Sequence, residues 1–169
     1  LSKVNLFPIL RRLHMAKLEI KENKKLVLKK VICKKLLGAQ LDNVDNEIEK
    51  FHQHLQLLNV QLFGPLVVKN SGTKIHEDGQ LTTDFELYVQ AHDFRQYNKI
   101  YEVAEEISVP HCLYLRFEDS PEYLQLAYSK MELYFYENDL QTDGTTYTVY
   151  VNSTLDQMTA DIFRPVISL

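Results

Sequence analysis

The 169-residue sequence predicts an α+β fold that contains a β-α-β-β module twice. Two amphipathic stretches with helical spacing are each framed by segments rich in Val, Ile, Leu and Tyr, which is typical of helices between strands. In addition, FGPLVVKNS (63–71) and DGTTYTVYVNS (143–153) share a glycine turn, an apolar and β-branched run and a final Asn-Ser. Because neither module alone would bury a sheet face well, we expect one antiparallel-rich sheet with two helices on one face.

The chain is expected to begin with a leader or vector-derived extension at residues 1–17. Pro8 interrupts its short apolar part, and no small-residue cleavage site follows. A signal peptide is the alternative interpretation of this segment. A single domain is expected at 18–169. Its predicted parts are module one (18–92), a connector (93–109) and module two (110–169).

Module one should open with a strand over 18–37, where Val, Ile and Leu alternate loosely with polar residues until Gly38 ends the strand. Eight lysines lie between Lys17 and Lys35. Because exposed lysines discourage pairing between sheet edges, this pattern favours an edge strand.

A helix is predicted over 41–59, because its apolar residues recur at steps of three and four. Asp42 or Asn43 is the expected N-cap, and Asn59 is a plausible C-terminal stop. The predicted buried stripe consists of Val44, Ile48, Phe51, Leu55 and Leu58.

Gly64-Pro65 is a turn signal, and strands are expected over 66–71 and 81–91 with a polar loop at 72–79 between them. Alternation assigns the side chains of the second strand to two faces. Phe85, Leu87 and Val89 lie on the predicted core face, and Asp84, Glu86 and Tyr88 lie on the other.

The connector is predicted to be helical over 93–107, with Asp93 as its cap and apolar residues at helical steps. Module two then begins with a strand over 111–118. A helix follows over 119–140, with Ser120 as N-cap and a proline at its first position. Its predicted buried residues are Leu124, Ala127, Tyr128, Met131 and Phe135.

An Asp-Gly turn at Gly144 and strands over 146–153 and 160–168 complete module two. Pro165 cannot donate a ladder hydrogen bond, so we expect it at an edge or a bulge of the last strand.

Charge is distributed unevenly along the chain. Residues 1–35 contain eleven Lys or Arg and two Glu, a net charge of +9, whereas residues 36–169 have a net charge of −13. The acidic remainder would repel a phosphate backbone, so we expect no nucleic-acid binding. No apolar run approaches the ~20 residues of a membrane helix, and no membrane association is expected.

No catalytic or metal-binding signature is recognisable in the sequence. His52 and His54 point to different helix faces, and His111 and Cys112 lie on opposite strand faces, so neither pair forms a site. We expect Cys33 and Cys112 to be reduced core thiols in a cytoplasmic protein, with one structural disulfide as the alternative. The sequence therefore predicts a non-enzyme that needs no cofactor.

The element order resembles the GyrI-like effector-binding superfamily, whose members are two fused β-α-β-β modules related by a pseudo-twofold axis. The residues that support this resemblance are Phe63-Gly64-Pro65, Ala127-Tyr128, the strand from Tyr147 to Tyr150, and Asp161 before Pro165-Val166. The resemblance covers about 18–169. Within that superfamily, the chain is similar to small stand-alone firmicute members.

The resemblance implies a cleft between the modules, lined by aromatic residues and carboxylates, that binds a small molecule. Aromatic ring faces attract cations, and a carboxylate among them adds the opposite charge. The predicted ligand-binding residues are Glu86, Tyr88, Tyr114, Arg116, Tyr147, Tyr150 and Asp161. Arg164 departs from the superfamily's usual apolar residue, which makes an anionic or neutral ligand as plausible as a cation.

Each of these residues also has a structural interpretation. The tyrosines can be half-buried packing residues, the carboxylates can be solvated, and Arg116 can form an ion pair with Glu86 or Asp161. Three further functions stay open: a protein-interaction or inhibitor module that uses its charged surfaces, a small hydrolase with Tyr114 and Glu86, and a haem protein without an obvious axial histidine.

Overall fold

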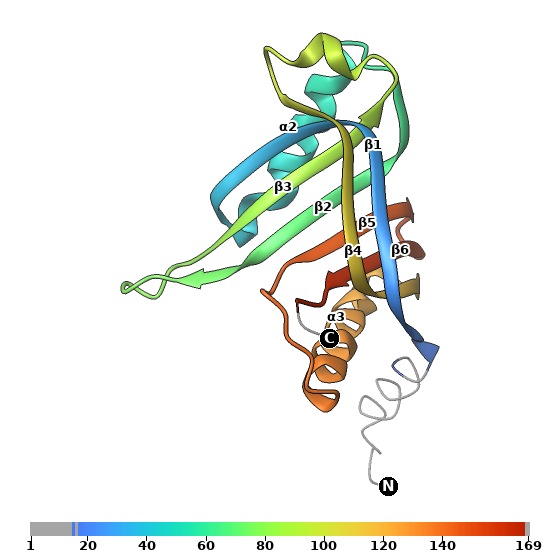
Figure 1. Cartoon of the computed structure of the whole chain (residues 1–169). Coiled ribbons are helices and arrows are strands. Elements are labelled where there is room, and N and C mark those ends of the chain that lie inside the picture. The colour runs from blue at the N-terminus through green and yellow to red at the C-terminus, as the bar shows by residue number, and fades with distance from the viewer. Residues whose placement is uncertain (1–14, 16, 168–169) are drawn as a thin grey trace, which may run out of the picture.

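The computed structural model describes Met15 and residues 17–167, so most of the predicted leader lies outside the described residues. Two β-α-β-β units follow each other in the described chain (Figure 1), which confirms the predicted fold class. The first unit comprises β1 (Ile20–Gln40), α2 (Val44–Leu57), β2 (Leu62–Ile75) and β3 (Leu81–Ala91). The second comprises β4 (Glu102–Asp119), α3 (Leu124–Glu137), β5 (Thr146–Ser153) and β6 (Met158–Pro165). The boundaries of the two modules along the chain stay a prediction.

All strand pairs are antiparallel, and the strand order β1-β3-β2-β5-β6-β4 closes because β4 pairs with β1. Equivalent strands of the two units are neighbours, since β1 pairs with β4 and β2 pairs with β5. The two similar stretches noted in the sequence thus lie side by side, with Val67 opposite Val149. This arrangement is what a twofold relation between the units requires.

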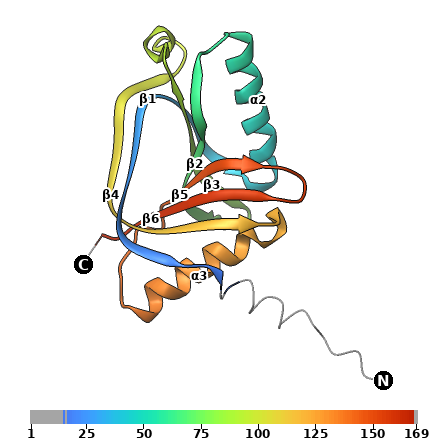
Figure 2. The same cartoon turned by 90° about the vertical axis from the view of Figure 1, so that its right-hand side faces the viewer.

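Each helix packs on the outer face of the closed sheet. Phe51 and Leu55 of α2 pack against Leu87 of β3, and Met131 of α3 packs against Leu115 of β4, each almost fully buried. In Figure 2, α2 lies above and α3 below β5 and β6. No helix in the described part of the chain is long and apolar enough to cross a membrane.

The inner face of the sheet forms a third packed region, which we call the inner cluster. It consists of Leu26, Leu28, Val31, Cys33, Val67, Tyr88, Tyr147 and Val149. Because the sheet curls onto itself, its second face is also removed from water. Both faces of β3 are therefore packed, rather than the single face that alternation suggested.

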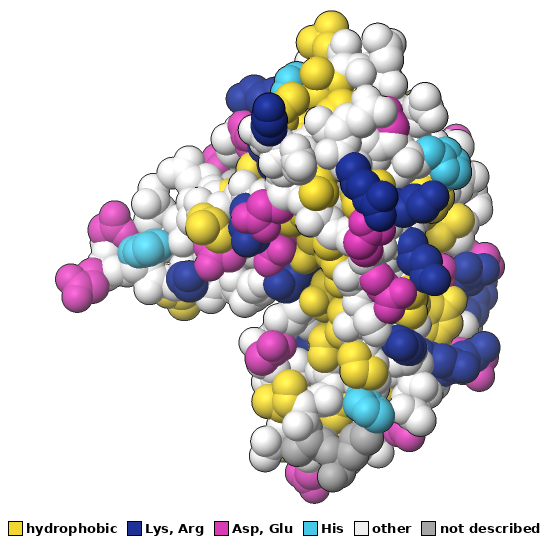
Figure 3. Space-filling model, turned by 45° about the horizontal axis from the view of Figure 1, so that its top comes forward, with side chains coloured by type: hydrophobic (Ala, Val, Ile, Leu, Met, Phe, Trp, Pro, Cys, Tyr) yellow, Lys and Arg dark blue, Asp and Glu magenta, His cyan; other side chains and the backbone are white. Residues whose placement is uncertain are grey.

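The prediction that the first strand lies at a sheet edge is wrong. β1 pairs with β4 over its first part and with β3 over its second, and Val31, Ile32 and Cys33 are paired on both sides. Two of its lysines, Lys29 and Lys35, form ion pairs with Glu106 and Glu102 of β4. Figure 3 shows cationic and anionic side chains interspersed on the visible face.

Three predicted strand boundaries are also wrong, because glycines with positive φ form irregularities inside strands. Gly38 (φ +62°) does not end β1, since its N–H donates to Asp84 Oδ1 at 2.8 Å and the strand continues to Gln40. Gly64 (φ +73°) lies within β2 instead of a turn, at a register shift against β3. β2 then continues to Ile75, through the first part of the predicted loop.

The predicted helix over 93–107 is wrong as well. A short 3-10 turn at Phe94–Tyr97 is followed by β4, which already begins at Glu102. Ile107 of β4 is paired with Leu28 of β1, and it packs against the inner cluster. Long-range pairing with β1 therefore overrides the local helical spacing.

The helices begin without the predicted side-chain caps. No cap hydrogen bond comes from the side chain of Asn43, and Ser120 precedes a 3-10 turn at Pro121–Tyr123 rather than the α-helix itself. Ser120 contributes its carbonyl oxygen, which accepts from Tyr123 N–H at 3.0 Å. By contrast, Asn59 has a φ of +53° after α2, as expected of a helix stop.

Candidate functional site

An open groove of about 1020 Å³ lies on the outer face of the sheet. Its floor is the β2–β5 pair, where Val68 lies opposite Thr148 and Asn70 lies opposite Thr146. Phe85 of β3 and Leu41 lie at the end nearer α2. The groove therefore lies where the two β-α-β-β units meet, and its size suits a small molecule.

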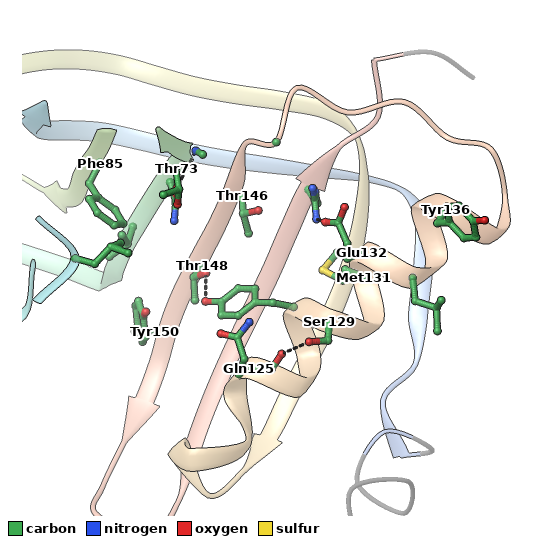
Figure 4. A pocket seen from close by; sticks show the side chains of 18 residues that line it. Thr73, Phe85, Gln125, Ser129, Met131, Glu132, Tyr136, Thr146, Thr148 and Tyr150 are labelled. Atoms are coloured by element: carbon green, nitrogen blue, oxygen red, sulfur yellow. Dashed lines mark hydrogen bonds and ion pairs between the residues drawn. The ribbon is translucent and has the colours of Figure 1, made fainter. Parts of the chain in front are cut away.

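Helix α3 forms one wall of the groove (Figure 4). Gln125, Ser129, Glu132 and Tyr136 recur at steps of four, three and four, so they share one helix face. The buried residues Ala127, Met131 and Phe135 hold the helix on the sheet. The helical period thus places one face of α3 on the sheet and another along the groove.

Hydroxyl groups give the groove most of its hydrogen-bonding capacity. The Tyr128 and Thr148 hydroxyls are 2.7 Å apart, linking the wall to the floor, and Ser129 donates to its own helix at Gln125 O. Burial raises the pKa of Tyr128 and of Tyr150, so both phenols stay protonated at neutral pH. Such neutral hydroxyls both donate and accept hydrogen bonds.

The aromatic lining comes mainly from the second unit. Phe85 belongs to the first unit, whereas Tyr128, Tyr136 and Tyr150 belong to the second. This asymmetry agrees with the aliphatic residues of FGPLVVKNS and the tyrosines of DGTTYTVYVNS.

One ion pair contributes the charges among the lining residues that the structure describes. Arg164 of β6 reaches the groove beside Glu132 of α3, and its Nη1 donates to Glu132 Oε2. The Arg164 guanidinium also lies 4.9 Å from the centre of the Phe135 ring.

The predicted ligand-binding residues are not gathered in this groove. Tyr150 lines it, whereas the other six lie on the inner strand face, where five of them belong to two hydrogen-bonded groups and Tyr147 is buried nearby. These six residues are Glu86, Tyr88, Tyr147, Tyr114, Arg116 and Asp161. Their role in binding a ligand stays a prediction.

The first group surrounds Glu86. Its carboxylate accepts hydrogen bonds from Lys69 Nζ and Tyr88 OH, both at 2.7 Å, and the Cys33 thiol lies 3.7 Å away. Burial opposes ionisation of Glu86, but the two hydrogen bonds outweigh it, so the pKa of Glu86 lies below its ordinary value. Tyr147 is buried nearby in the inner cluster, and burial raises its pKa to about 12.

The second group surrounds Asp161. Arg116 donates to both carboxylate oxygens, from Nε at 2.8 Å and from Nη2 at 2.9 Å, and Tyr114 OH donates at 2.7 Å. Burial again opposes ionisation, but these bonds hold the pKa of Asp161 below its ordinary value. The predicted ion pair of Arg116 is confirmed. The side chains of Asp161 and Glu86 are only 15% and 20% exposed, so the prediction of solvated carboxylates is wrong.

Tyr114 and Glu86 are the two residues named above for a hydrolase. Glu86 is bonded to Lys69 and Tyr88, whereas Tyr114 is bonded to Asp161, so these two residues serve different groups. Within the described part of the chain, three or more His, Cys, Asp or Glu side chains never group in a way that could hold a metal ion.

Both cysteines are free and buried, as predicted for core thiols. Burial raises the pKa of Cys33 to about 12 and that of Cys112 to about 11. His111 is exposed next to buried Cys112, and its Nδ1 lies 3.1 Å from Asn23 Oδ1. Because burial holds both thiols protonated at neutral pH, each is a poor nucleophile.

The groove residues that sequence reasoning missed are those that share a strand face with the hydrophobic core. Thr146, Thr148 and Asn70 lie on the helix-covered side of the sheet, and none of them is among the predicted ligand-binding residues. Their small polar side chains in strands rich in Val and Tyr were the available signal. Tyr128 is predicted above as part of a buried helix stripe, and Arg164 as a charge at a usually apolar position. Neither is predicted to line a groove.

No family model matches the sequence, and neither does any curated protein. Solved structures are similar to it at low identity. The EcmrR C-terminal domain has 13% identity and a TM-score of 0.63, over 90% of this chain and 98% of that chain. EcmrR in an EcmrR–DNA complex has 14% identity and a TM-score of 0.64, over 95% of this chain and 65% of that longer chain.

SAV2435 bound to tetraphenylphosphonium is similar at 12% identity and a TM-score of 0.52, over 89% of this chain and 93% of that chain. At these identities the likeness concerns the fold, which agrees with the closed six-stranded sheet and its two helices. The chain therefore has the GyrI-like effector-binding fold.

Proposed function

We propose that this protein is a non-enzymatic small-molecule-binding protein whose ligand occupies the groove between α3 and the β2–β5 pair. The observation that carries this proposal is a cavity of about 1020 Å³ at the junction of the two units. Hydroxyls and aromatic rings line it, a mixture that is typical of ligand pockets. The fold it shares with tetraphenylphosphonium-bound SAV2435 supports the same function.

The composition of the lining supports binding rather than catalysis. The groove residues that the structure describes include no histidine or cysteine, and their carboxylate, Glu132, is paired with Arg164. General acid–base or nucleophilic catalysis would need such a group next to an activating partner.

The alternative of a charged protein-interaction surface gains less support. Lys35 Nζ lies 2.9 Å from Glu102 and Lys29 Nζ lies 3.9 Å from Glu106, so acidic residues of β4 offset lysines of β1. The unequal charge of the sequence is thus partly cancelled across one strand pair.

Thermal stability measured against a broad panel of dyes, lipophilic ions, nucleotides and neutral aromatic compounds tests the proposal. A ligand at 100 times its Kd should stabilise the native state by about 2.7 kcal/mol. Ser129→Trp, on the groove wall, should abolish this shift by filling the site. Gln53→Trp, on the exposed face of α2, is the matched control and should retain it.

Two results would contradict the proposal. The first is an unchanged melting temperature across the whole panel. The second is a ligand whose stabilisation is as large in Ser129→Trp as in Gln53→Trp, because that ligand would occupy another site.

A further inference from the structure

The cation that lines the groove is held in an unusual way. The Arg164 side chain is 11% exposed and stacks over Phe135, so its position is fixed by packing. Its Nε is buried and has no hydrogen-bond partner among the described residues. A guanidinium can donate five hydrogen bonds in a planar fork, and a carboxylate normally takes two of them side by side. Arg164 therefore has donor capacity that Glu132 does not use.

The carboxylate that pairs with Arg164 is far less firmly placed. Glu132 is 67% exposed on α3, and its Oε2 accepts from Arg164 Nη1. Ion pairs with an exposed partner contribute little free energy, because water competes for the charge and a long side chain must be ordered. Glu132 can therefore leave Arg164 at small cost, whereas Arg164 cannot leave the groove wall.

The other lining side chains carry no charge to balance Arg164. Gln125, Ser129, Thr146 and Thr148 are neutral, and so are the protonated phenols of Tyr128 and Tyr150. Asp45 at the start of α2 is close enough to Tyr150 to help raise the pKa of that phenol. It is exposed, however, and does not line the groove.

We infer that the groove selects an anionic ligand with an apolar, aromatic body, whose carboxylate or sulfonate replaces Glu132 on Arg164. This inference rests on the proposed function of the groove. A cation would meet the fixed charge of Arg164 and find Glu132 already paired. An anion would complete the hydrogen bonds of the guanidinium while its apolar part packs against Phe85 and Tyr150, which lie toward the other end of the groove.

Isosteric probes of opposite charge test the sign of the selected ligand. We would measure binding of tetraphenylborate and tetraphenylphosphonium to the full chain by calorimetry, at equal ionic strength. We expect tetraphenylborate to bind at least about tenfold more tightly. Anthracene-9-carboxylate should likewise bind more tightly than its uncharged amide, since only the carboxylate can pair with the fork.

Variants of the ion pair test the assignment to Arg164. Glu132→Gln removes the internal competitor and should raise the affinity for both anions about two- to fivefold. Arg164→Lys keeps the charge but loses the planar fork, and it should weaken anthracene-9-carboxylate about tenfold. Glu105→Gln makes the same charge change at the exposed Arg95–Glu105 pair and should change neither affinity.

The outcomes separate the inference from the function it rests on. Equal binding of the two tetraphenyl ions, or tighter binding of the phosphonium, would overturn the inference and leave small-molecule binding standing. An increase in Glu105→Gln as large as that in Glu132→Gln would also overturn it, because net charge alone would then explain the effect. If the four probes bind neither the wild type nor Glu132→Gln, the inference is wrong, and the broad panel decides separately on the function.

Discussion

At the scale of single residues, two mostly buried carboxylates hold neighbouring strands together on the inner face of the sheet. Asp161 of β6 bonds Arg116 and Tyr114 of β4, and Glu86 of β3 bonds Lys69 of β2. In both groups, hydrogen bonds to the charged form outweigh the cost of burial, which is why each carboxyl pKa is lowered. These residues thus stabilise the fold, whatever else they bind.

The lowered pKa of Asp161 predicts a specific dependence of stability on pH. Its ordinary pKa is 3.8, so the stabilisation is fully present above that pH and is lost as the pH falls through the lower folded-state value. Asp161→Asn should lower the free energy of unfolding at pH 7 by about 1–2 kcal/mol, since Arg116 is half exposed. The difference from wild type should shrink below pH 3 in urea denaturation.

Glu105→Gln is the control for this experiment, because its Arg95 partner is mostly exposed and the pair should contribute little at any pH. A gap between Asp161→Asn and wild type that is the same at pH 7 and pH 2.5 would show that the ionised carboxylate is not the stabilising species.

At the scale of elements, bulges set the course of the long strands. Gly64 interrupts the β2–β3 ladder, and a Cβ at this position would lie 2.9 Å from Gln90 Nε2. Gln90 cannot simply move away, because its Oε1 accepts from the Lys29 N–H at 2.8 Å. The bulge in β2 is thereby linked to the point at which the pairing of β1 with β3 begins.

Gly64→Ala should therefore destabilise the protein more than Gly144→Ala. Both glycines have positive φ, so each substitution should cost about 1–2 kcal/mol of backbone strain. At Gly144 a Cβ meets open space, whereas at Gly64 it should cost about 1 kcal/mol more through the Gln90 hydrogen bond. Equal unfolding free energies of the two variants in denaturant would refute the proposed link.

At the scale of the whole molecule, the two units share one hydrogen-bonded sheet instead of folding around separate sheets. The β1–β4 and β2–β5 pairs both join the first unit to the second, and the inner cluster takes residues from each. Opening either unit would expose the inner cluster, so the free energies of the two units are coupled.

We accordingly expect a single cooperative unfolding transition for the 169-residue chain. Far-UV circular dichroism reports the helices and strands, and tyrosine fluorescence reports the tyrosines, which are spread over both units. The denaturant midpoints of the two signals should coincide. Two separated transitions would mean that the units unfold independently, and the β2–β5 and β1–β4 pairs would then be weak junctions.

The element types were largely predictable, because they depend on local spacing. Phe51 and Leu55 of α2, Ala127 and Met131 of α3, and the alternation in β3 all gave correct assignments. Local spacing failed at 93–107, where a sequence that fits a helix becomes part of β4 through its pairing with a distant strand. It also failed at Gly38 and Gly64, where glycine marks a bulge and not an end.

The candidate site was less predictable. The predicted ligand-binding residues included both Tyr147 and Tyr150, which lie on opposite faces of β5. Alternation in β3 divides its side chains correctly between two faces. It carries no information on whether the second face meets water, a ligand or another part of the sheet. Closure of the sheet buries that face, so the tyrosines became core residues and the groove formed on the face that carries Phe85 and Thr148.

The order of residues alone was thus enough to predict two β-α-β-β units and the buried faces of α2 and β3, since these follow from periods of 3.6 and 2 residues. The location of the groove and the pairing of Arg164 with Glu132 were decided only when β4 closed onto β1 and β2 onto β5. Those contacts join residues far apart in the chain, and no local period encodes them.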